Sequence, residues 1–99
     1  MTPEKRLRAA NQLISLSSLA DDLFMVRAQD LNFKHIDWTD FYREAEDDKR
    51  ILIDFIRCIV DNEVGCDLAS ISLLNDYDRE AVVHGLSIAF TTKDGIDNG

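Results

Sequence analysis

The sequence lacks the features that most directly assign a protein to a compartment or a function. No apolar run is long enough to cross a bilayer, and the N-terminal segment has no apolar stretch of the kind found in signal peptides. There is no internal repeat and no low-complexity tract. We therefore expect a cytoplasmic protein with no membrane partner, and 99 residues leave room for one domain, over residues 1–90.

Cysteine is scarce too, with only Cys58 and Cys66 in the chain. In a reducing compartment both are expected to be free thiols, and a disulfide between them is the alternative. The side chains that most often bind zinc are His35, Cys58, Cys66 and His84, at intervals of 23, 8 and 18 residues. Because zinc ligands usually come in close pairs, these spacings predict no metal site.

Catalytic motifs are also absent: there is no phosphate loop, dinucleotide fingerprint, nucleophile elbow or HExxH helix. Cys66 and His84 could form a nucleophilic pair, but we favour a half-buried thiol beside a helix end. Asp54 could act as an acid among isoleucines. However, Arg50 and Arg57 flank it at helical spacing, which favours a paired, ionised carboxylate. We therefore predict no enzyme and no cofactor.

Positive charge is in short supply. The chain has 11 basic and 19 acidic residues and a formal charge of −8. Residues 30–65 alone hold ten acidic and five basic side chains, whereas residues 1–29 hold three acidic and four basic side chains. Such a chain is repelled by nucleic acid and attracted to basic protein surfaces, so we expect a protein partner and no direct nucleic-acid binding.

A first helix is predicted from Pro3 to Ala28, with Thr2 as its cap and proline at its first position. Its apolar residues recur at 3.6-residue spacing. They are Leu7, Ala10, Leu13, Ile14, Leu16, Ala20, Leu23 and Phe24. The pattern is weakest between Ser15 and Ser18, and a separate helix starting at Ser18 is the alternative.

A second helix is predicted from Trp38 to Val64, capped by Asp37 or Thr39 and closed by Gly65. It would be about 40 Å long. Residues 50–61 are rich enough in isoleucine and valine to form a buried strand instead. The polar residues favour the helix, because spacings of three and four place them on one seam along which they can pair. They are Arg43, Glu46, Arg50, Asp54, Arg57 and Asp61.

Two shorter helices complete the prediction. Asp67 can cap a helix from Leu68 to Leu74, and residues 75–78 form a turn before a last helix from Arg79 to Phe90. The predicted buried stripe of this helix is Val82, Val83, Leu86, Ala89 and Phe90. Gly85 costs about 1 kcal/mol relative to alanine inside a helix, which predicts a close helix crossing there. Residues 91–99 are predicted to be a disordered tail.

The predicted fold class is all-α: a compact bundle of two long antiparallel helices covered by the two shorter C-terminal helices. On the second helix, five carboxylates fall within an arc of about 100° that contains no basic residue. They are Asp37, Asp40, Glu44, Asp47 and Asp48. Acids also favour the start of a helix for dipole and solubility reasons, so a purely solvated face is the alternative.

Beside this acidic row, Trp38, Phe41 and Tyr42 open the same helix. Core anchoring is their commonest role, and Trp38 and Tyr42 also suit an interface hot spot. We therefore predict a non-enzymatic inhibitor or modulator whose acidic face binds a basic partner surface. A nucleic-acid-handling machine is one such partner, by analogy with small acidic phage proteins that mimic nucleic acid. The alternative is a structural adaptor or homodimerisation module.

Overall fold

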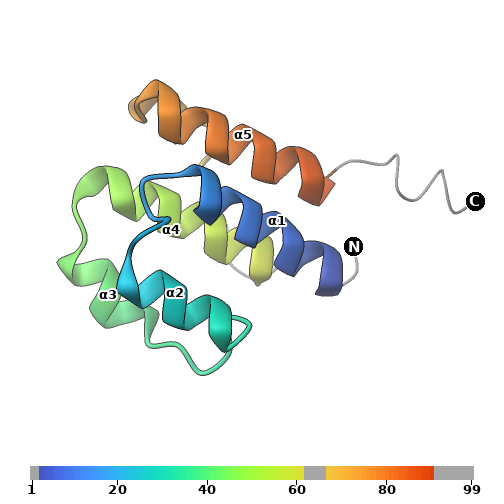
Figure 1. The fold of residues 1–99 in the computed structure, drawn as a ribbon. Helices are drawn as coiled ribbons and strands as arrows, with labels where there is room; N and C mark the ends of the chain where they lie inside the picture. Colours follow the sequence, from blue (N-terminus) through green and yellow to red (C-terminus); the bar gives the residue numbers. More distant parts are fainter. Residues whose placement is uncertain (1–2, 62–66, 91–99) are drawn as a thin grey trace, which may run out of the picture.

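The computed structural model describes residues 3–61 and 67–90, and every element in these ranges is helical (Figure 1). In chain order the elements are α1 (Pro3–Leu16), α2 (Leu23–Asp30), α3 (Trp38–Glu44), α4 (Asp47–Val60), the 3₁₀ helix η1 (Leu68–Leu73) and α5 (Asp76–Phe90). The predicted all-α class is confirmed, and residues 50–60 are helical rather than extended. Gly65 and the predicted tail, residues 91–99, lie outside the described residues.

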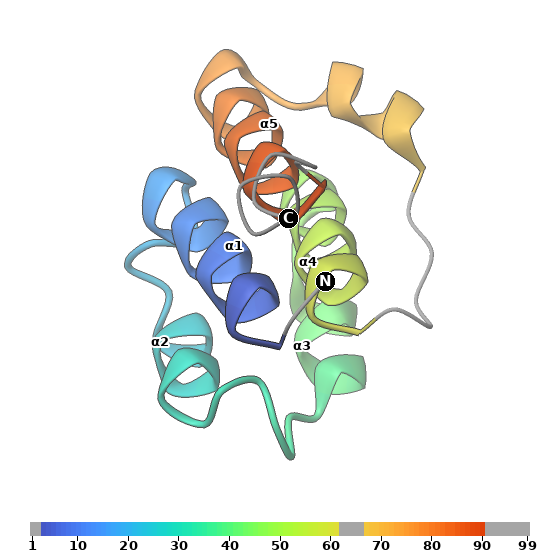
Figure 2. The ribbon, with the colours of Figure 1, turned by 90° about the vertical axis from the view of Figure 1, so that its right-hand side faces the viewer.

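The core is enclosed by α1, α4 and α5, which lie side by side, with α1 packed against both of the others (Figure 2). These helices have 14, 14 and 15 residues, and they supply most of the fully buried apolar side chains. The shorter helices α2 and α3 form a second layer beneath α1 and α4 (Figure 2). Within this layer α2 contributes the completely buried Met25 and Ala28, whereas no residue of α3 is fully buried.

The predicted first helix is interrupted between Leu16 and Leu23, which corrects the single helix from Pro3 to Ala28. In a continuous helix the Ser18 N–H would donate to the Ile14 carbonyl. It donates instead to Oδ1 of Asp78, 2.8 Å away, and the Ser18 hydroxyl donates to Oδ2 at 3.0 Å. A new helix then starts at Leu23, where the Asp22 carboxylate accepts the Met25 N–H. The weak point in the periodicity was therefore a real break.

Asp78 is completely buried at the start of α5, and its surroundings explain why this position tolerates a carboxylate. Besides the two bonds from Ser18, Oδ2 accepts a longer bond of 3.4 Å from the Asn75 side-chain amide. Asn75 caps α5 by accepting the Asp78 N–H at 2.8 Å, so the helix begins at Asp76, three residues before the predicted start. An acid in the first turn also interacts favourably with the helix dipole.

The predicted second helix is also divided, because α3 ends at Glu44 and α4 begins at Asp47. Arg50 occupies the bend: Nε donates to the Tyr42 carbonyl at 2.9 Å and Nη2 to the Arg43 carbonyl at 2.8 Å. These carbonyls would otherwise accept N–H groups of a continuing helix. At the other end, α4 stops at Val60 rather than Val64, since Asp61 has an extended backbone. The prediction of two long antiparallel helices is therefore wrong in detail.

Gly85 does mark a close helix crossing, as predicted. A β-carbon placed on Gly85 would lie 2.9 Å from Cβ of Leu13 and 3.3 Å from the Ala9 carbonyl oxygen. The face of α5 that meets the core is accordingly built around small residues, with Ala81, Gly85 and Ala89 all buried. This orientation leaves Val83 and Phe90, which were predicted to be buried, more than half exposed at 53% and 57%.

Candidate functional site

The bend between α3 and α4 divides the predicted acidic row between two helices. Asp37 is the N-cap of α3, where its carboxylate accepts the Asp40 N–H at 3.4 Å. Asp40 and Glu44 lie on α3, and Asp47 and Asp48 form the first turn of α4. A single arc of five carboxylates on one straight helix is therefore not what the chain forms.

Asp40 and Glu44 instead meet two acids from another part of the chain. A groove of about 660 Å³ lies between the start of α2 and the outer side of α3. Its lining residues are Ser18, Asp21, Asp22, Leu23, Phe24, Asp40, Phe41, Glu44 and Lys49. Four of these nine carry carboxylates and Lys49 alone is basic, so the groove has a negative potential. We call this feature the acidic groove.

The apolar wall of the acidic groove is held by an aromatic pair. The rings of Phe24 and Phe41 stack with centroids 4.0 Å apart and 12° between their planes, which joins α2 to α3. Beside them Leu23 is 85% exposed, the highest exposed fraction among the large apolar residues of the described chain. The groove thus combines carboxylates, which attract cations, with apolar surface that gains free energy when it is covered.

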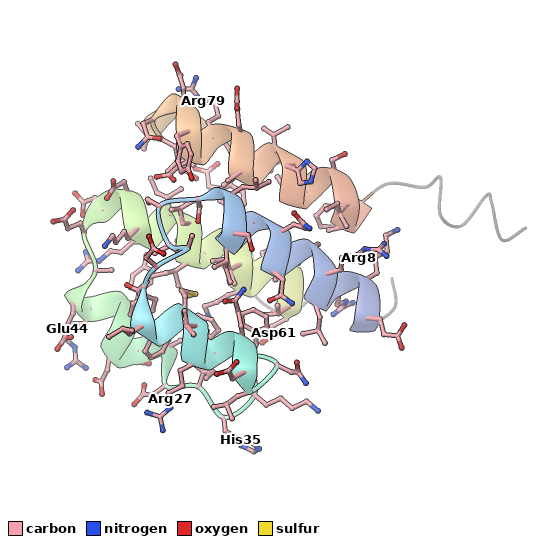
Figure 3. The ribbon with its side chains drawn as sticks, in the orientation of Figure 1. Arg8, Arg27, His35, Glu44, Asp61 and Arg79 are labelled. Atoms are coloured by element: carbon pink, nitrogen blue, oxygen red, sulfur yellow. The ribbon has the colours of Figure 1, made fainter. Side chains whose placement is uncertain are left out.

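Arginine side chains approach two members of the predicted row. Arg43 lies 3.4 Å from Asp40, and Arg50 lies 3.8 Å from Asp47. Arg43 and both aspartates are well exposed, with exposed fractions of 66% or more. Such surface pairs contribute only about 0–1 kcal/mol, so a cation from a partner can displace them at little cost. Figure 3 shows Glu44 at the end of α3, pointing away from the body of the protein.

Sequence reasoning did not find the contribution of Asp21, Asp22 and Leu23. The prediction placed these residues inside one long helix, on faces unrelated to the acidic row. The available signal was the alternative helix start near Ser18, because a cap at the head of a new helix brings acids together with its first turn. Their approach to Asp40 and Glu44 depends on how α2 packs against α3 and has no counterpart in the local sequence.

Trp38 and Tyr42 are predicted site residues that do not line the acidic groove, although the centroid of the Trp38 ring lies 6.1 Å from that of Phe24. Both are half-buried and pack against the core. The Arg57 guanidinium lies over the Trp38 ring at 5.7 Å from its centroid, and Arg50 lies over the Tyr42 ring at 5.4 Å. Core anchoring, the commonest role of such aromatics, therefore describes both, and their predicted contact with a partner stays a prediction.

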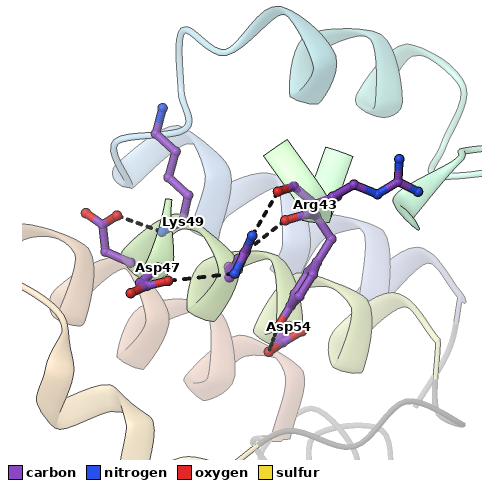
Figure 4. A network of polar contacts seen from close by, with 7 residues as sticks. Arg43, Asp47, Lys49 and Asp54 are labelled. Atoms are coloured by element: carbon purple, nitrogen blue, oxygen red, sulfur yellow. Dashed lines mark hydrogen bonds and ion pairs between the residues drawn. The ribbon is translucent and has the colours of Figure 1, made fainter. Parts of the chain in front are cut away.

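The Tyr42 hydroxyl donates a hydrogen bond of 3.3 Å to Oδ2 of Asp54 (Figure 4). Burial raises the pKa of Asp54, while this hydrogen bond and the charge of Arg57 lower it. Burial and the neighbouring Asp54 carboxylate also raise the pKa of Tyr42. Among the described residues Asp54 forms no ion pair with Arg50, whereas the charge of Arg57, the other predicted partner, does act on it. Arg50 instead bonds the α3 carbonyls and faces Asp47, and Arg43 points outward (Figure 4).

The remaining candidates for chemistry are dispersed. His35 and His84 are exposed, Cys58 is a half-buried free thiol, and Cys66 lies outside the described residues. Among residues 3–61 and 67–90, no three histidine, cysteine, aspartate or glutamate side chains gather as ligands for a metal ion. In the same ranges no helix is both long enough and apolar enough to cross a bilayer.

Comparison with known proteins places the chain in no group: no family model, curated protein or solved structure matches it. Its function is therefore argued from its own residues.

Proposed function

We propose that this chain is a non-enzymatic inhibitor or modulator that docks the acidic groove on a basic surface of a partner protein. The observation that carries the proposal is the convergence around one groove of Asp21 and Asp22, from the connection before α2, with Asp40 and Glu44 of α3. Local helix capping explains Asp22 and does not require the other three to meet. Lysine and arginine side chains of a partner complement such a surface.

The apolar wall adds a second element of recognition. An exposed leucine beside stacked phenylalanines suits an anchor that is buried at the centre of an interface, with the carboxylates as its polar rim. A nucleic-acid-handling enzyme is the partner class that fits best, since its basic channel already accepts closely spaced negative charges. Because the chain itself is strongly acidic, attraction at a distance should also accelerate association.

The decisive experiment compares two doubly reversed variants with the same change in net charge. Asp40→Lys with Glu44→Lys alters the acidic groove, whereas Asp30→Lys with Glu80→Lys alters exposed positions outside it. Partners captured by the wild-type chain are identified, and their affinities for both variants are measured at two salt concentrations. We expect the groove variant to lose binding and the control to retain it, with wild-type affinity falling as salt rises. Equal loss in both variants would show that net charge alone is responsible and would exclude docking through the groove.

A second candidate function, a homodimerisation module, is favoured by apolar side chains on another face. Nine large apolar residues are exposed in the described ranges, and five belong to η1 and α5. These five are Leu68, Leu73, Tyr77, Val83 and Phe90. Sedimentation velocity distinguishes the candidates: a dimer that Val83→Asp with Phe90→Asp dissociates supports self-association, and a monomer at all concentrations excludes it.

A further inference from the structure

A second groove, also of about 660 Å³, opens at the other end of the α3–α4 side of the molecule. It lies where α1 begins, α4 ends and the α2–α3 connection passes, and we call it the basic pocket. Its lining includes Arg6, Phe33, Lys34, Trp38, Arg57 and Asp61. Glu44 of the acidic groove and Asp61 of the basic pocket lie far apart in Figure 3.

The charge of this pocket is opposite to that of the whole chain. Arg6, Lys34 and Arg57 are three of its 11 basic residues, and Asp61 is the one acid in the lining. Among the described residues none of the three makes an ion pair, and Nε of Arg6 is buried without a hydrogen-bond partner. Buried donors are nearly always satisfied, so an unpaired guanidinium nitrogen beside two more cations suits a bound anion.

One wall of the basic pocket is the connection that follows α2, where local hydrogen bonds define the backbone. Asn32 and Phe33 have left-handed backbones, with φ of 54° and 60°. Their N–H groups donate to the Gln29 and Ala28 carbonyls at 3.0 and 2.8 Å, the hydrogen-bond pattern of a Schellman motif at the end of α2. Asparagine adopts this conformation readily, but phenylalanine does so at a cost. This strained backbone at Phe33 lies in the loop that lines the pocket.

The lining also includes four apolar or aromatic residues, Leu7, Phe33, Trp38 and Val60. Phe33 and Trp38 both pack against the core, and Arg57 lies over the Trp38 ring, so these aromatic side chains hold the pocket in shape. A volume of several hundred Å³, an apolar wall and a few converging charged groups are typical of a small-molecule site. Three cations around one pocket favour a doubly charged group over a singly charged one, because each can interact with a different oxygen.

We propose that the basic pocket binds a small aryl phosphate monoester, with the phosphate held by Arg6, Lys34 and Arg57 and the planar group against Phe33 and Trp38. This site is independent of the acidic groove and of the function proposed for it. Binding involves no covalent step.

Trp38 is the only tryptophan in the chain, so its fluorescence reports on this pocket directly. Phenyl phosphate is titrated into the full chain, with phenyl sulfate, of equal shape and one negative charge, and phenol, with none, as comparison ligands. We expect a saturable change with phenyl phosphate, weaker binding of phenyl sulfate, and none of phenol. Lys34→Gln and Arg57→Gln should each weaken phenyl phosphate binding about tenfold, which corresponds to the loss of one charge-assisted hydrogen bond.

Lys49→Gln is the matched control, since it removes the same charge from the acidic groove. It should bind phenyl phosphate as the wild type does. Because Lys34 is exposed, Lys34→Gln tests the pocket without disturbing the fold, and melting temperatures verify this for each variant. The proposal is overturned if phenyl phosphate gives no saturable change, if phenol binds as tightly, or if Lys49→Gln weakens binding as much as Lys34→Gln.

Discussion

The three long helices, α1, α4 and α5, and the α2–α3 layer differ in how many buried side chains stabilise them. In α1, α4 and α5 the buried side chains are mainly apolar, and the one buried carboxylate of these helices, Asp78, has hydrogen bonds to both oxygens. In the α2–α3 layer the helices have eight and seven residues, and α3 has no fully buried side chain. The acidic groove is lined largely by α3 and the start of α2, whereas the basic pocket is also lined by residues of α1 and α4. Most of the fully buried apolar side chains thus belong to the long helices, and the grooves lie where the outer layer meets them.

The largest expected effect tests whether the long helices carry the fold. Ile56 is completely buried on α4, and Ile56→Asp should unfold the domain, because burying an unpaired charge costs several kcal/mol and small domains have about 5–15 in total. Ile59→Asp should do the same. Leu23→Asp in the outer layer should leave the melting temperature nearly unchanged, since Leu23 is 85% exposed. If thermal unfolding of Ile56→Asp matched the wild type, the assignment of the core to α4 would be wrong.

The next effect concerns the polar contact that fixes the ends of α1 and α5. Asp78→Ala would leave the Ser18 N–H without its partner and should reduce the free energy of unfolding by about 3 kcal/mol. Asp76→Ala, in the same helical turn, removes an exposed ion pair with Arg79 and should cost less than about 1 kcal/mol. Urea denaturation of both variants measures the difference. Equal losses would contradict a special role for the buried carboxylate.

A smaller effect tests the close crossing of α1 and α5. Gly85→Ala adds a β-carbon 2.9 Å from Cβ of Leu13 and 3.3 Å from the Ala9 carbonyl oxygen. Neither atom can move aside freely, because the oxygen belongs to the backbone of α1 and the Leu13 Cβ is bonded to that backbone. Overpacking of about 1–3 kcal/mol should exceed the gain of about 1 kcal/mol in helix propensity. Ser87→Ala, on the exposed side of α5, gains propensity without a clash and should be neutral or slightly stabilising. A Gly85→Ala variant more stable than the wild type would exclude the close crossing.

The smallest effect lies where the α2–α3 layer meets α4. Burial raises the pKa of Asp54 from its ordinary 3.8, so the folded state binds this proton more tightly than the unfolded state. Stability should therefore fall as the pH rises from 3.8 through the raised folded pKa, and this contribution should be missing in Asp54→Asn. At neutral pH Asp54→Asn should be more stable by less than about 0.5 kcal/mol.

The control for Asp54→Asn is Asp30→Asn, a neutralisation at an exposed position of α2. Melting temperatures of both variants and the wild type are compared across the acidic range. If Asp54→Asn were less stable than the wild type at neutral pH, the carboxylate would be stabilised by its arginine neighbours, as the sequence predicted.

Local patterns were sufficient for part of this structure. The charge spacing along residues 50–61 identified a helix, because a strand would have scattered those charges over both faces. Gly85 identified the helix crossing, because an interior glycine is costly unless its missing β-carbon admits a neighbour. The acidic residues Asp40 and Glu44 were recognised, and their neighbours in the groove were not.

The sequence by itself determined the all-α class, the approximate positions of the helices and the excess of negative charge. These depend on periodicity, capping and composition, which act over a few residues. Tertiary structure decided where the two predicted long helices break. Asp78 accepts a hydrogen bond from the N–H of Ser18, 60 residues away, and Arg50 donates hydrogen bonds to two carbonyls of the preceding helix. Both breaks follow from competition for backbone hydrogen bonds by side chains that only the folded chain brings near. The acidic groove and the basic pocket lie apart because these breaks turn the chain between the helices.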